Sequence, residues 1–157
     1  MSFKIILQFI LGLSLILFAA VVTWYEGSEI IDNPWEWKYS APFSNMLNGE
    51  INGKQDISQL DYFIYAMKFK PVFPTVLLLS SLYFFILSGY LFLKRSLNKF
   101  CYFLRIIGAL LIFLSTFLSN SPSMGAEVIR NTLLSCSASL IGISFIIYFL
   151  AVRKTTI

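Results

Sequence analysis

Four long apolar runs dominate the chain and determine its organisation. They cover residues 5–25, 71–93, 100–119 and 132–152, and only the third contains a charged side chain, Arg105. A bilayer core of about 30 Å needs about 20 apolar residues of helix, because each residue adds roughly 1.5 Å. The pattern therefore predicts an all-α membrane protein: one domain over residues 1–157, with four transmembrane helices in an up-down bundle.

Composition favours the same class. Hydrophobic residues make up 57% of the 157 residues and charged residues 13%, against about 45–50% and about 25% in soluble domains. A soluble domain of this size has too much surface for its volume to hide so many apolar side chains. The first run is longer than a signal-peptide core, and Ala19 and Ala20 are followed by a poor cleavage site. We therefore expect it to remain as a span.

The charged residues are sorted between the two sides of the predicted bundle. With four spans, both termini lie on one side, which carries no acid and these bases: Lys4, Lys94, Arg95, Lys99, Arg105, Arg153 and Lys154. All eight acidic residues fall on the other side. Because lysine and arginine are enriched on the cytoplasmic side, both termini are predicted to be cytoplasmic. Anchoring at span ends explains the inner bases, so the net charge of +4 does not indicate nucleic-acid binding.

Residues 26–70 form an outer loop that is far longer than the usual connection of about 4–6 residues. We expect this extracytoplasmic loop to be structured. Asp56 followed by Gln59 fits a capping box. Apolar residues then recur at helical spacing: Ile57, Leu60, Ile64 and Met67. A short amphipathic helix is predicted over about 57–69, lying on the outer leaflet or on the ends of the spans.

All three tryptophans of the chain lie at the start of this loop, among tyrosines and acids. The candidate partner-binding residues are Trp24, Tyr25, Glu26, Trp35, Glu36, Trp37 and Tyr39. Tryptophan and tyrosine collect at membrane–water interfaces, so one interpretation is a belt that fixes the depth of the first span. A second is a recognition surface for a partner. A catalytic role for the carboxylates is the third.

Most catalytic chemistry lacks its usual residues here. The chain has no histidine and only two cysteines, Cys101 and Cys136. Cys101 is predicted to lie near the cytoplasmic side of the membrane and Cys136 near the outer side. Zinc sites, triad-type nucleophiles and thiol–disulfide exchange are therefore disfavoured. No acid lies within a span, as proton- or ion-coupled transport usually requires. The sequence therefore predicts no catalytic, cofactor-binding or metal-binding residue. We expect that the protein is not an enzyme.

Two features within the spans remain. Arg105 lies near the inner end of the third span, where its long stem can reach the interface. It is a candidate contact for a lipid headgroup, and contact with a partner protein is the alternative. In the fourth span, Ser135, Ala138, Ser139 and Gly142 are candidate helix-packing residues, because small side chains let helices approach closely. They are expected to pack within the bundle, or else against a second copy or a larger complex.

The aromatic segment carries a resemblance to other proteins. The runs Trp24-Tyr25-Glu26-Gly27-Ser28 and Pro34-Trp35-Glu36-Trp37-Lys38-Tyr39-Ser40 resemble those of small uncharacterised multi-pass membrane proteins of Gram-positive bacteria. The resemblance implies a bacterial cell membrane and no known activity. Our main hypothesis is a non-catalytic accessory or interaction protein that uses its outer loop, with the bilayer and a membrane protein or a second copy as partners. The alternative is a small oligomeric channel, a holin-like protein or an export component.

The predicted topology can be tested by labelling with a thiol reagent that does not cross membranes. In a variant without Cys101 and Cys136, a cysteine at Asn52 should be labelled from outside intact cells. A cysteine at Ser96 should be labelled only after the membrane is opened, because that turn is predicted to be cytoplasmic. Labelling of position 96 from outside would show that the topology is wrong.

Overall fold

The computed structural model describes residues 3–119 and 121–155, and these form helices joined by turns. Four helices are long: α1 (Phe3–Gly27), α5 (Val72–Leu93), α6 (Leu97–Phe117) and α7 (Met124–Thr155). All four are long and apolar enough to cross a membrane, so the predicted all-helical fold with four candidate spans is confirmed. In α7 the side chains are described as far as Ala151, which leaves those of Arg153 and Lys154 outside the described part.

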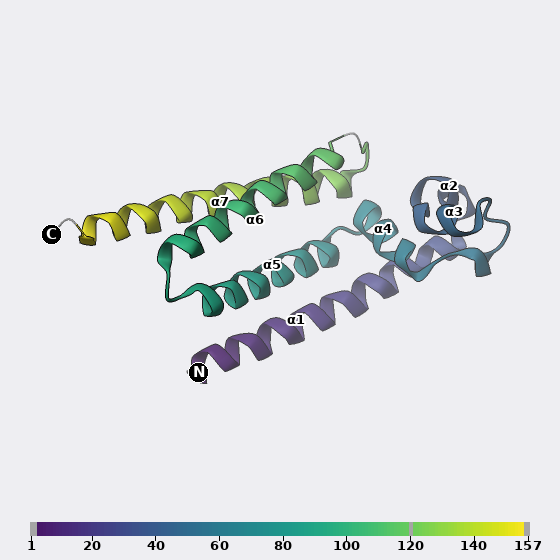
Figure 1. Cartoon of the computed structure of the whole chain (residues 1–157). Coiled ribbons are helices and arrows are strands. Elements are labelled where there is room, and N and C mark those ends of the chain that lie inside the picture. Colours follow the sequence, from purple (N-terminus) through teal and green to yellow (C-terminus); the bar gives the residue numbers. More distant parts are fainter. Residues whose placement is uncertain (1–2, 120, 156–157) are drawn as a thin grey trace.

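The long helices run up and down, but they pair unevenly. α1 packs along α5, and α6 packs along α7, with fewer contacts between the two pairs. The chain therefore forms two helical hairpins side by side rather than one evenly packed bundle (Figure 1). Both termini and the α5–α6 turn lie at one end, while the segment between α1 and α5 lies at the other.

That segment, residues 28–71, is called the cap here. It contains three 3-10 helices, η1 (Ser28–Asp32), η2 (Pro34–Glu36) and η3 (Lys54–Asp56), and three α-helices, α2 (Trp37–Ser40), α3 (Pro42–Asn48) and α4 (Gln59–Phe69). The predicted N-cap of α4 is wrong. Ser58 occupies that position and its side chain accepts a hydrogen bond from Leu60 N, while Asp56 accepts bonds from Asn52 N and Gly53 N at 3.1 Å.

The two helices of each hairpin are held together by different contacts in the two hairpins. On α1 the buried residues are small, Gly12, Ala19, Thr23 and Gly27, and they form one stripe. Between α6 and α7, an apolar cluster that includes Leu104 and Leu133 is accompanied by hydrogen bonds from buried serines. Ser137 Oγ donates to Gly108 O at 2.9 Å, and Ser144 Oγ donates to Cys101 O at 3.1 Å. Such close, bonded contacts favour helix association in lipid.

The expectation that four small residues of α7 pack within the bundle is wrong. Ser135, Ala138, Ser139 and Gly142 are all exposed, and a Cβ atom added at Gly142 would meet nothing within 4 Å. The buried face of α7 instead carries Ile129, Leu133, Ser137, Leu140 and Ser144. The four small residues are left free to contact a second copy or another protein, which stays a prediction.

Helix α4 is wedged between the ends of two long helices. Its backbone lies so close to α1 that a Cβ atom at Gly27 would overlap the carbonyl group of Tyr62. On its other side, a Cβ atom at Gly125 of α7 would overlap the carbonyl groups of Met67 and Lys68. Two glycines thus allow the cap to rest directly on both hairpins.

Replacing either glycine with alanine should displace the cap. We expect Gly27→Ala and Gly125→Ala each to destabilise the cap by about 1–3 kcal/mol, the usual cost of overpacking. Gly142→Ala is the matched control, because it gains helix propensity of up to about 1 kcal/mol in open space. Thermal unfolding in detergent followed by tryptophan fluorescence reports on the cap end, where all three tryptophans lie, and far-ultraviolet circular dichroism reports on the long helices. Equal stability of all three variants would contradict the inference that α4 packs directly against Gly27 and Gly125.

Candidate functional site

The cap has a hydrophobic core of its own. Ile30, Ala41, Ile57, Tyr62 and Tyr65 are buried together and come from four separate segments of the loop. The hydroxyl of Tyr65 also accepts a hydrogen bond from the side chain of Asn33 at 2.9 Å. A loop that closes over buried side chains is a structured unit, so its outer surface is held in a fixed shape.

A buried carboxylate organises this unit. Asp61 of α4 is fully buried, and it accepts hydrogen bonds from Phe43 N at 2.9 Å, Ser44 N at 2.8 Å and Ser44 Oγ at 2.5 Å. These groups form the first turn of α3, where free N–H groups and the helix dipole favour a negative charge. Ser44 Oγ in turn accepts from Ser58 N at 2.7 Å. Asp61 therefore caps α3 from another helix and links it to the start of α4.

The structure separates the predicted aromatic residues into two groups. Trp37 is folded against the cap core, and its Nε1 donates a hydrogen bond to Ile30 O at 2.8 Å. Trp24 lies at the end of α1 beside the ring of Tyr62, with 6.1 Å between the ring centroids. Trp24 is nevertheless 41% exposed, and Trp35, Tyr25 and Tyr39 are more exposed still, Trp35 at 88%. The seven predicted residues therefore do not form a single surface.

Helix α3 adds further exposed apolar side chains that follow the aromatic segment closely in the sequence. Phe43, Met46 and Leu47 are exposed, and their spacing places them on one face of this helix. Met46 is 84% exposed. We group these three residues with the exposed Trp35 and Tyr39 under the name apolar cap surface. The exposed residues of α3 were not predicted from the sequence, although the spacing of Phe43, Met46 and Leu47 is a helical signal.

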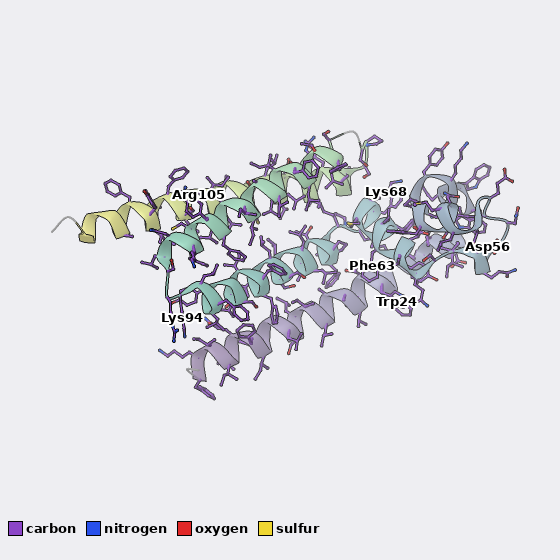
Figure 2. All side chains as sticks on the ribbon, viewed as in Figure 1. Trp24, Asp56, Phe63, Lys68, Lys94 and Arg105 are labelled. Carbon is purple, nitrogen blue, oxygen red and sulfur yellow. The ribbon has the colours of Figure 1, made fainter. Side chains whose placement is uncertain are left out.

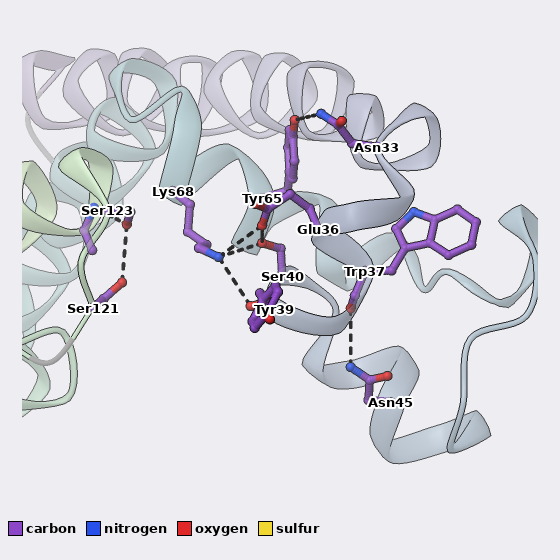
Figure 3. Close-up of polar contacts among 11 residues, drawn as sticks. Asn33, Glu36, Trp37, Tyr39, Ser40, Asn45, Tyr65, Lys68, Ser121 and Ser123 are labelled. Carbon is purple, nitrogen blue, oxygen red and sulfur yellow. Dashed lines mark hydrogen bonds and ion pairs between the residues drawn. The ribbon is translucent and has the colours of Figure 1, made fainter.

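Glu36, a predicted site residue, is partly exposed and is held in a group of polar contacts. It accepts hydrogen bonds from Ser40 Oγ at 2.7 Å and from Lys68 Nζ at 3.4 Å. Lys68 Nζ also donates to Ser40 Oγ and to Tyr39 O (Figure 3). The group borders a groove of about 530 Å³ between the cap and the α6–α7 connection, lined on its apolar side by Ile64, Met67, Leu118, Ala126 and Ile129.

The other loop charges also tie segments together. Lys70 pairs with Glu29, and Lys54 pairs with Asp32 at 2.6 Å. The hydrogen bond to Glu29 raises the pKa of Lys70 above its ordinary value of 10.5. The predicted residue Glu26 is half-buried, and its Oε2 atom has no hydrogen-bond partner among the described residues. Within residues 3–119 and 121–155, no three metal-ligating side chains are grouped together.

Arg105, the remaining predicted site residue, belongs to α6, and its side chain contacts α7. It lies away from the cap, toward the other end of the long helices (Figure 2). Its Nε donates a hydrogen bond to Ser144 Oγ at 2.9 Å. Three aromatic rings surround its guanidinium, those of Tyr102, Phe145 and Tyr148. The neighbouring helix α7 therefore holds the Arg105 side chain in place, and its predicted contact with a lipid headgroup stays a prediction.

Comparison with known proteins places the cap within a shared region. A family model described as "Domain of unknown function (DUF4306)" matches residues 6–93, which include nearly all of α1, the cap and α5. The uncharacterised protein YjdJ of Bacillus subtilis (strain 168) is 38% identical over 81 residues, which are 50% of this chain and 74% of YjdJ. No solved structure matches.

These matches support the resemblance to an uncharacterised family found in Gram-positive bacteria. They do not themselves show a membrane location, which is inferred from the four apolar helices. The family match spans more than half of the 157 residues. On that basis, the chain belongs to the DUF4306 family.

Proposed function

We propose that the protein is a non-catalytic interaction protein of the bacterial cell membrane whose apolar cap surface binds another protein. In this proposal both termini are cytoplasmic and the cap faces outward. The observation that carries it is the exposure of Trp35 and Met46 on a segment that is otherwise closed around its own core.

Exposure of such side chains on a fixed scaffold is what makes them suitable for binding. Clustered exposed apolar side chains mark interaction sites, whereas isolated ones need no explanation. Because α3 is held by Asp61 through three hydrogen bonds, the backbone that carries Met46 and Leu47 is already ordered before a partner binds. A preorganised surface with an aromatic anchor such as Trp35 is typical of binding hot spots.

The carboxylates support a structural role rather than chemistry. Glu36 is engaged by Lys68 and Ser40, and Glu29 is engaged by Lys70. A general acid or base needs to reach a substrate in a cleft and to have a matched pKa. In the cap these groups instead join segments distant in sequence.

A single substitution tests the binding proposal. Trp35→Ala should reduce capture of the partner by more than about tenfold, because an aromatic hot spot typically contributes 2 kcal/mol or more. Capture is measured by photo-crosslinking from position 46 in native membranes, followed by identification of the crosslinked species. Folding should be unaffected, since a change at an exposed site usually shifts stability by less than about 0.5 kcal/mol.

Two controls make this test specific. A crosslinker at Lys99, at the opposite end of the bundle, should not capture the same species. Glu36→Gln should leave capture unchanged, because the Glu36 carboxylate is already engaged by Lys68 and Ser40. If Glu36→Gln abolished capture and Trp35→Ala did not, the carboxylate rather than the apolar surface would be the functional group.

The alternative function, a small oligomeric channel, makes a different prediction. A channel needs a polar lumen between copies, and the exposed hydroxyls of Ser135 and Ser139 on α7 are candidates to line one. We expect vesicles containing the purified protein to retain a small fluorescent dye as well as empty vesicles do. Reproducible leakage that is lost on Ser135→Leu would favour the channel over the interaction protein.

A further inference from the structure

Arg105 carries a positive charge, and no acidic side chain among the described residues forms an ion pair with it. The ion pairs among the described residues all lie in the cap. All eight acidic side chains of the sequence lie between positions 26 and 127, in the cap, beside it or in the first turn of α7. A second copy in the same orientation would therefore have no acidic side chain at the level of Arg105. An unpaired charge in an apolar layer is costly, so the geometry calls for an anion from elsewhere.

Contacts with α7 and with Tyr102 hold the guanidinium of Arg105 in a defined position. Ser144 is fully buried and accepts the hydrogen bond from Arg105 Nε at 2.9 Å, while its own hydroxyl donates to Cys101 O. The ring centroids of Phe145, Tyr148 and Tyr102 lie 4.6, 5.5 and 5.7 Å from the guanidinium carbon. The two Nη groups have no hydrogen-bond partner among the described residues, which leaves the donors of the guanidinium fork available.

The site lies toward the basic end of the bundle. Arg105 is eight residues from Leu97, the first residue of α6, a rise of about 12 Å. Side chains tilt toward the N-terminus of their helix, so Arg105 leans toward the α5–α6 turn. That turn and the first turn of α6 carry three exposed bases, Lys94, Arg95 and Lys99. A ligand that reaches Arg105 from this end is therefore drawn by positive charge.

We propose that Arg105, Tyr102 and Tyr148 form a binding site for the phosphate group of an anionic phospholipid. The guanidinium fork matches two phosphate oxygens, and the tyrosine hydroxyls can donate to a third. The rings of Tyr102, Phe145 and Tyr148 are each partly exposed, so an acyl chain can lie against them while the phosphate reaches the guanidinium. This proposal is independent of what the cap binds.

The test is native mass spectrometry of the full chain released from nanodiscs of mixed phosphatidylglycerol and phosphatidylcholine. Wild-type protein should retain phosphatidylglycerol in excess over phosphatidylcholine. Arg105→Gln should reduce that retention by about fivefold or more, the scale expected for one basic residue near an anionic surface. Arg105→Lys keeps the charge but loses the fork, and it should also reduce retention, which separates a built site from general attraction.

Two further variants define the outcome. Arg95→Gln removes an exposed base of the turn and should reduce retention less than Arg105→Gln does. Tyr148→Leu should weaken retention without changing the net charge, and its helix content by circular dichroism should match that of the wild type. Full retention by both Arg105 variants would overturn the proposal. Displacement of the lipid by millimolar inorganic phosphate would also overturn it, by showing a site for free phosphate.

Discussion

The backbone of α4 touches two long helices, and both contacts are made at a glycine. Gly27 ends α1 and Gly125 is the second residue of α7, so α4 lies across the ends of both hairpins. Elsewhere the two hairpins contact each other only sparsely. The orientation of the cap relative to the long helices therefore depends on these two close approaches, and so does the groove beside Lys68, whose far wall belongs to the α6–α7 hairpin.

Within the cap, the equivalent constraint is the charge of Asp61. Burying a carboxylate without partners costs several kcal/mol. Here three donors in the first turn of α3, Phe43 N, Ser44 N and Ser44 Oγ, offset that cost. Ser44, which makes two of these bonds, is buried, while Phe43, Met46 and Leu47 of the same helix are exposed. The buried charge therefore fixes which face of α3 points into the cap, and the apolar residues of α3 lie on the other face.

The long helices and the presence of α4 could be predicted from the sequence, because both follow from hydrophobic runs and spacing. Roles that depend on distant partners could not. Trp35 and Trp37 are two positions apart and chemically identical, yet only Trp37 finds an acceptor, Ile30 O. The buried face of α7 also could not be predicted from the spacing of its hydrophobic residues. A helix that is apolar all round gives no periodic signal for its buried side, and α7 carries small residues on both faces.

Polar side chains within the long helices are the better guide to their inner faces. In an apolar surrounding a hydroxyl or a guanidinium needs a partner, and Ser137, Ser144 and Arg105 all find one across the α6–α7 interface. That hairpin lies outside the residues matched by the DUF4306 family model, which end at Leu93. It nevertheless supplies Gly125, one of the two contacts that support α4. In this chain, the cap lies within the family match but is held in place partly by a helix that the match does not include.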